Sequence, residues 1–137
     1  MSRVARSARV ASRQRVETIS ADKTIVTAET GELYLVDGSG LGGSMTITLP
    51  SPQDGAYFTF LLKANSAAQK IFIDSGTGNT ISGRLQQGDT DADMIDHSNQ
   101  KLGFGASAKR GSCVELVSDG SAWYVIQAES DVAFVIS

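Results

Sequence analysis

The sequence predicts an all-β protein: a single compact β-sandwich or jelly-roll-like barrel that carries an extended basic N-terminal arm. After residue 20, short runs of β-branched or alternating apolar residues are separated by Gly, Asp and Pro turn signals. No stretch in that region keeps the 3.6-residue period of a long helix. The 137 residues suffice for one ordinary domain. We therefore divide the chain into an arm, residues 1–20, and a β domain, residues 21–137.

The arm differs in charge from everything that follows it. Residues 1–18 contain five arginines and one acid, so their net charge is 5 − 1 = +4. Residues 19–137 contain 7 Lys/Arg and 14 Asp/Glu, a net charge of 7 − 14 = −7. A basic arm on an acidic body is typical of a protein that interacts with a partner. The arginines are Arg3, Arg6, Arg9, Arg13 and Arg15.

Four interpretations of the arm are open at this point. Its composition fits a mitochondrial-type transit peptide. Its arginines could also bind phosphates, although it offers no lysine or aromatic side chain for nucleic acid. It could be a solvated tail. We favour a docking arm on an acidic protein surface, in which the five arginines make ionic contacts and three valines provide apolar anchors: Val4, Val10 and Val16.

The first strands of the β domain surround a central stretch, Ser44–Lys63. There Met45–Leu49 alternates apolar and polar residues, and Tyr57–Leu62 is rich in aromatic and aliphatic ones. Pro50, Pro52 and Gly55 place a rigid turn between these two strands. The other strands expected in this half are Thr24–Ala28, Leu33–Val36, Lys70–Asp74 and a short Thr80–Ser82 that Gly83 closes.

The second half begins with a break in the pattern. Arg84–Gln100 is polar and acidic without a sustained period, so we expect a long surface loop with room for a short hairpin. Strand signals resume afterwards, and Asp119-Gly120 marks a turn. The strands expected here are Lys101–Phe104, Cys113–Val117, Trp123–Gln127 and Val132–Ile136.

The residue pattern offers no catalytic, cofactor or metal site, so we do not expect an enzyme. The acidic run that begins at Asp89 does not match the helix-flanked calcium-binding motif, because Met94 and Gln100 stand where that motif needs Gly and Glu. An irregular calcium site or a solvated loop tip remains open for Asp89, Asp91, Asp93 and Asp96. His97 and Cys113 are the only residues of their kinds, too few for a zinc site. We expect Cys113 to be a buried structural thiol and Trp123 a core residue.

Three short motifs carry a family resemblance. They are Thr46-Ile-Thr-Leu-Pro50 followed by Gly55, then Ile81-Ser-Gly83, then the run Val114–Ile126, VELVSDGSAWYVI. Together they resemble the small β-domains of tailed-bacteriophage virion proteins. Such domains occur in capsid decoration (cement) proteins and in head or tail fibres, usually as trimers.

The resemblance implies a non-enzymatic capsid decoration protein on the outer capsid surface of the virion. Such a protein would bind the major capsid protein as a homotrimer and stabilise capsomer contacts. The basic arm and the absence of a stalk after the β domain favour this interpretation. The alternative is a receptor- or glycan-binding tail or head fibre protein. Nucleic acid, a membrane and a small-molecule ligand are not expected as partners. For the membrane, the reason is that no segment reaches the ~18 apolar residues of a membrane span.

Overall fold

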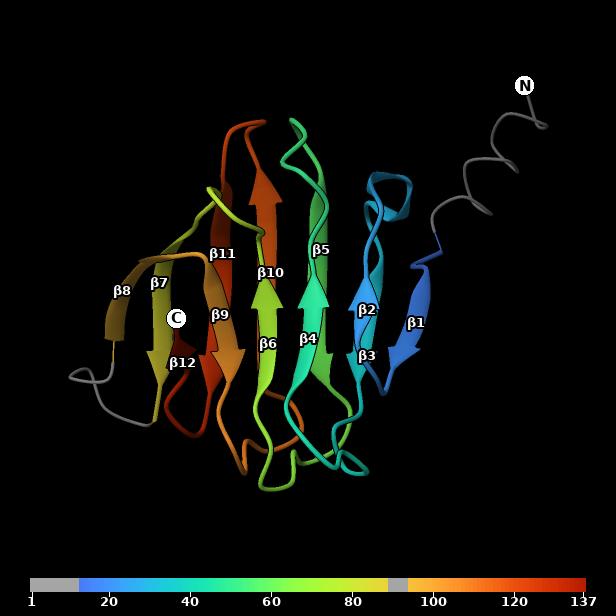
Figure 1. Ribbon diagram of the computed structural model, residues 1–137, viewed down its shortest axis with the longest axis vertical. Coiled ribbons are helices and arrows are strands. Elements are labelled where there is room, and N and C mark those ends of the chain that lie inside the picture. The colour runs from blue at the N-terminus through green and yellow to red at the C-terminus, as the bar shows by residue number, and fades with distance from the viewer. Residues whose placement is uncertain (1–12, 89–93) are drawn as a thin grey trace.

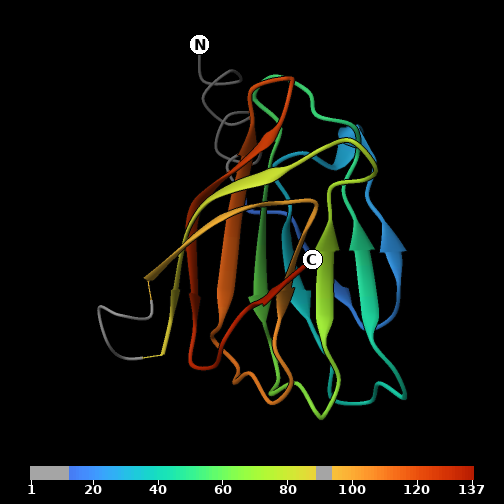
Figure 2. The same cartoon turned by 60° about the vertical axis from the view of Figure 1, so that its left-hand side comes forward.

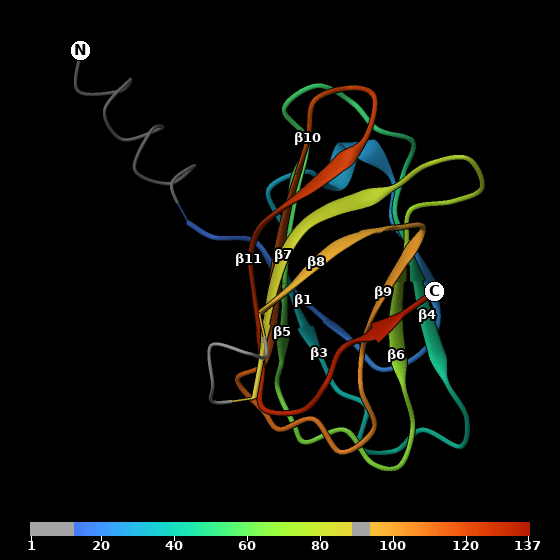
Figure 3. The same ribbon diagram turned by 90° about the vertical axis from the view of Figure 1, so that its left-hand side faces the viewer.

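The computed structural model describes residues 13–88 and 94–137, which form two β-sheets packed face to face (Figures 1 and 3). The seven-stranded sheet has the order β1-β3-β5-β10-β11-β7-β8, and the five-stranded sheet has the order β12-β9-β6-β4-β2. The predicted all-β sandwich is therefore confirmed. The strands of the larger sheet are β1 (Val16–Ile19), β3 (Leu33–Val36), β5 (Tyr57–Leu62), β7 (Ile81–Gln87), β8 (Met94–Asn99), β10 (Cys113–Ser118) and β11 (Trp123–Ser130). Those of the smaller sheet are β2 (Lys23–Thr24), β4 (Met45–Thr48), β6 (Ile71–Asp74), β9 (Lys101–Phe104) and β12 (Val135–Ile136).

The first six strands alternate between the two sheets. As a result, β1, β3 and β5 pair in parallel in the larger sheet, and β2, β4 and β6 pair in parallel in the smaller one. This winding differs from the antiparallel hairpins of a jelly roll. The later strands are mainly antiparallel: β10 lies between β5 and β11, and β9 between β6 and β12.

The proline-bounded turn at the centre of the sequence connects the two sheets. Strand β4 belongs to the five-stranded sheet and β5 to the seven-stranded sheet, so the two strands do not pair with each other. Gly55 has φ 81°, a left-handed conformation that favours glycine. Its N–H donates to the carbonyl of Ser118 at 2.9 Å, which fixes the turn against the end of β10. The turn thus carries the chain from the smaller sheet to the larger one.

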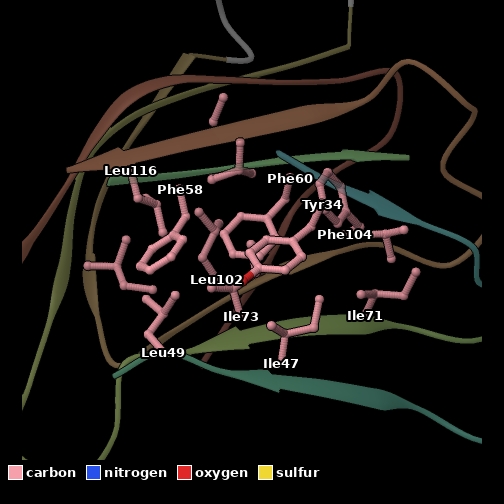
Figure 4. Close-up of a cluster of buried hydrophobic side chains, with 14 of the residues drawn as sticks. Tyr34, Ile47, Leu49, Phe58, Phe60, Ile71, Ile73, Leu102, Phe104 and Leu116 are labelled. Atoms are coloured by element: carbon pink, nitrogen blue, oxygen red, sulfur yellow. The ribbon is translucent and has the colours of Figure 1, made fainter. Parts of the chain in front are cut away.

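Aromatic and aliphatic side chains fill the space between the sheets (Figure 4). Tyr34 stacks on Phe60 with ring centroids 5.5 Å apart, and Phe58 packs against Trp123 at 5.7 Å. Burial of each such side chain contributes about 1.5–3 kcal/mol relative to leaving it exposed. The prediction that Trp123 is a core residue is confirmed, since it is 0% exposed.

Three predicted segments differ from the structure. Of the first expected strand, Thr24–Ala28, only Thr24 is extended, as the second residue of β2, and Thr27–Glu29 forms the 3-10 helix η1. Residues 16–19, placed within the arm, form β1, because Leu33 N–H and its neighbours supply a parallel partner. The prediction of a loop over Arg84–Gln100 is wrong.

In its place, β7 continues through Gly83 to Gln87 and pairs antiparallel with β8. This is the hairpin that the sequence left open as a smaller feature of that loop. The strand passes Gly83 because that residue has φ 147° and no side chain, and a Cβ there would lie 2.7 Å from Val125 Cβ. The expected end of the strand at Gly83 is therefore wrong for a steric reason.

His97 fixes the point where the chain leaves the larger sheet. Figure 2 shows β8 running across into β9 of the smaller sheet. His97 is 1% exposed, with Nδ1 2.6 Å from the carbonyl oxygen of Ile81 and Nε2 3.0 Å from that of Lys101. The imidazole therefore joins β7 to β9.

The C-terminal strand is shorter than predicted but pairs with a sheet as expected. Within the expected range Val132–Ile136, only Val135–Ile136 forms β12, which lies antiparallel to β9. In the described ranges, the only helical element is the three-residue η1, so no helix there could span a membrane.

Candidate interaction surface

The arm joins the sandwich at a fixed point. Arg15 Nη2 donates to the carbonyl oxygen of Thr30 at 2.7 Å, and Gln14 Nε2 donates to that of Gly31 at 2.6 Å. The Leu33 N–H donates to the Arg15 carbonyl at 2.9 Å. These bonds hold the root of the arm against the turn between η1 and β3.

Of the residues proposed for partner binding, three lie in the described part of the chain. Arg13 and Arg15 are exposed at the arm root, and Val16 is 51% exposed at the start of β1. Arg15 is partly engaged with Thr30 of its own chain, which the sequence did not predict. The other members of the set lie outside the described residues: Arg3, Val4, Arg6, Arg9 and Val10.

Val16 lies on the side of the seven-stranded sheet that faces away from the core, and this side carries many apolar residues. We call it the outer face. Strand register aligns side chains into rows across it: Val16 lies beside Leu33, and Leu35 beside Leu61. Its apolar members are Val16, Leu33, Leu35, Tyr57, Leu61, Cys113, Val117, Tyr124 and Ile126. The sequence placed most of these residues in separate predicted strands, but it could not show that they would share one surface.

A β-bulge projects Ile126 from this face. The β10–β11 register shifts between Glu115 and Leu116, which leaves Ile126 as the extra residue of β11, 63% exposed. Beside it lies an open groove of about 250 Å³, lined in part by Arg84, Ile126 and Glu129. The bulge therefore gives an otherwise smooth sheet surface a ridge and a neighbouring groove.

Cys113 lies on the outer face at the start of β10, the central strand of the seven-stranded sheet. It is half-buried rather than the fully buried thiol that the sequence predicted, because the core side of β10 is taken by Val114 and Leu116. Burial raises the pKa of the Cys113 thiol, and the negative charge of Glu129 raises it further. Such a thiol is largely protonated at neutral pH and is a weak nucleophile.

Two tyrosines mark one end of the face. Tyr57 and Tyr124 flank Val117 in one row across β5, β10 and β11, and they are 52% and 42% exposed. Tyr124 Oη donates to Asp119 Oδ2 at 3.1 Å. This hydrogen bond raises the pKa of Tyr124.

A carboxylate cluster lies at the end of the sandwich where the arm begins. The carboxylates of Glu17, Glu29 and Glu32 come within 4.8 Å of one another. Lys23 Nζ already lies 3.0 Å from Glu29 and 3.4 Å from Glu17, so its ammonium occupies the position that a cation would take. The Glu29 ion pair raises the pKa of Lys23. Although burial opposes it, the Val26 N–H together with Lys23 lowers the pKa of Glu29.

This cluster lies at one exposed edge of each sheet. Glu17 belongs to β1 and Lys23 to β2, which are the outermost strands on this side of the two sheets. Charged side chains at sheet edges discourage pairing with strands of other chains. The cluster thus disfavours pairing of this edge with a strand of another chain.

The remaining chemical candidates are His97, the acidic run and a polar groove. Both ring nitrogens of His97 face backbone carbonyls, as described above. The calcium alternative lies outside the described residues for Asp89, Asp91 and Asp93, and outside the described side chains for Asp96. An open polar groove of about 510 Å³, lined by Lys109, Arg110 and Asp131 among others, shows no enclosed pocket for a small molecule.

Comparison with known proteins adds no relative. No protein-family model matches the chain, and a search of curated proteins finds no similar sequence.

Proposed function

We propose that this chain is a non-enzymatic virion structural protein, a capsid decoration protein that binds the outer surface of an assembled phage head as a homotrimer. The observation that carries the proposal is the fixed arm root. Arg15 and Gln14 hold the start of the basic segment against the Thr30–Gly31 turn. A tethered cationic segment adds a second foothold to any contact of the body, at high effective concentration.

The charge distribution agrees with this proposal. A protein that binds only the assembled shell stabilises it by mass action. Arginines suit carboxylate surfaces because their guanidinium groups bind in bidentate geometry. The major capsid protein is the proposed partner, and acidic residues on the assembled shell are the proposed target of the arm.

The test is co-sedimentation with purified heads. A variant lacking residues 1–12 retains the Arg15–Thr30 contact and β1, so the sandwich stays intact. A deletion of residues 1–18 would remove most of β1 and is the wrong variant. We expect the full chain to sediment with heads, the shortened chain to lose most binding, and added salt to weaken the full chain's binding because exposed ion pairs are screened. Undiminished binding of the shortened chain would refute the role of the arm.

A second candidate function rests on the row of Tyr57, Val117 and Tyr124. Two exposed aromatic rings on one row offer a stacking platform for a sugar, which fits a glycan-binding fibre protein. A glycan array separates the two functions. Glycan binding that Tyr57→Ala and Tyr124→Ala abolish, without co-sedimentation with heads, would favour the fibre protein.

A further inference from the structure

We propose that the outer face of the seven-stranded sheet binds a second copy of this chain, head to tail. In this contact the arm-root edge of one copy, at Arg13 and Val16, lies over Glu115 and Glu129 of the next copy. The inference deepens the proposed function, since that function calls for a homotrimer, and it names the surface through which the copies meet.

The contrast between the two outer surfaces of the sandwich carries the first step. Outward residues of the five-stranded sheet are mostly polar, including Thr46, Thr48, Asp74 and Lys101, and Lys101 covers Phe72 with its ammonium 5.9 Å from the ring centroid. That surface is therefore suited to contact with solvent. A sheet with one solvated face normally shows such polar residues on the outward positions.

The outward positions of the seven-stranded sheet break this rule. The most exposed apolar side chains there are Ile126 at 63%, Tyr57 at 52%, Val16 at 51% and Tyr124 at 42%. Strand β5 also carries the half-buried Leu61 on this face, while Thr59 and Glu115 are polar residues within it. Several exposed apolar side chains on one sheet face mark an interaction site.

Charge complementarity selects a second copy as the occupant. Glu115 and Glu129 lie on the outer face, and neither forms an ion pair with any described residue. Arg13, at the opposite edge, is also without an ion pair in residues 13–88 and 94–137. Within the described residues, one chain therefore carries acids without an ion pair on the outer face and a cation without an ion pair at the arm root. A head-to-tail contact pairs them.

The dimensions of the face give the arm a part in the contact. Five strands at ~4.8 Å spacing and six residues at ~3.3 Å rise make the face about 19 by 20 Å, on the order of 400 Å² in projection. Stable interfaces bury about 800 Å² per partner. The twelve residues before Arg13 can reach at most about 40 Å, roughly twice the width of the face. The arm can thus extend the contact across a neighbouring copy.

Head-to-tail contacts have a geometric consequence. They use two different patches of the same chain, so they close into a ring when the rotation between copies permits it. A threefold ring of this kind places three basic arms around one axis. This is the assembly that the proposed function requires.

The experiment is sedimentation velocity of the full chain over a concentration series, without heads. We expect reversible association to a trimer, and we expect Ile126→Lys to weaken the association at least about tenfold, as for a central contact residue. The matched control is Ile136→Lys, which alters an apolar residue 41% exposed on the other sheet. It should associate like the unaltered chain.

Cys113 supplies a second measurement that needs no variant. It is the single cysteine of the chain and lies on the proposed interface. Its alkylation rate should fall as protein concentration rises through the association range. This readout keeps the proposal testable if Ile126→Lys does not fold.

Three results would overturn the proposal. One is a monomer at all concentrations together with a constant Cys113 alkylation rate. Another is equal weakening by Ile126→Lys and Ile136→Lys. The third is a chain that stays monomeric and binds heads, and that loses this binding in Ile126→Lys. That result would assign the outer face to contact with the shell. A trimer that does not bind heads would leave this inference standing and refute the proposed function.

Discussion

Replacement of His97 by Ala tests whether the imidazole holds β7 and β9 together. The side chain is 1% exposed, and its nitrogens lie 2.6 and 3.0 Å from two carbonyl oxygens. A neutral ring donates to one carbonyl and an imidazolium to both. At a net value of about 1 kcal/mol for each hydrogen bond, the loss is about 1–2 kcal/mol.

The vacated space adds to this loss. A residual void of roughly 60 Å³ at about 24 cal/mol per Å³ costs about 1.4 kcal/mol. We therefore expect His97→Ala to lower the free energy of unfolding by about 2–3 kcal/mol. The matched control is Ser98→Ala on the same strand, an exposed residue whose hydroxyl lies 3.3 Å from that of Ser82. It should change stability by less than about 0.5 kcal/mol.

Urea denaturation followed by tryptophan fluorescence measures both variants. Trp123 is the single tryptophan and is fully buried, so its emission reports loss of the core. With a slope of about 1.5 kcal/mol/M, the midpoint for His97→Ala should fall by roughly 1.3–2 M. A loss below about 1 kcal/mol, or one equal to that of Ser98→Ala, would refute the bridging role of His97.

Two further predictions concern the backbone and the charged cluster. Gly83→Ala should destabilise the fold by about 2–4 kcal/mol, because the added Cβ would meet Val125 and because φ there is 147°. Gly78→Ala, at φ 83° with no atom within 4 Å of the added Cβ, should cost only about 1 kcal/mol. Equal losses in the same urea assay would contradict this explanation. The pKa of Glu29 is lowered from 4.5 in the folded state, so its contribution to stability is present above the unfolded pKa and is lost as pH falls from about 4.5 through the folded value. Glu29→Gln should therefore flatten the acid limb of a plot of unfolding free energy against pH. An unchanged acid limb would contradict this.

The sequence determined many of the strands and turns. Alternation in Met45–Leu49 predicted the half-buried strand β4, because a residue that points inward on a strand is followed by one that points outward. Gly, Pro and Asp pairs predicted most of the turns. The basic arm was also predicted from its cluster of arginines, although residues 16–19 near its end form a strand of the larger sheet.

The hairpin over Arg84–Gln100 was not predictable from local pattern. Its polar residues give little periodic signal, and β7 and β8 are stabilised by pairing with each other and by the neighbouring β11. His97 looked like an isolated polar residue for the same reason. Its partners, Ile81 and Lys101, are brought to it only by the folding of three strands.

The candidate site divides in the same way. The sequence by itself determined the β class, the burial of Trp123 and a basic arm on an acidic body, because composition, periodicity and charge are local properties of the chain. Only the tertiary structure decided that β4 and β5 lie in different sheets and that Val16 and Ile126 share one exposed surface. The physical reason is strand register: hydrogen bonds between distant segments decide which outward side chains become neighbours, and no single segment carries that information.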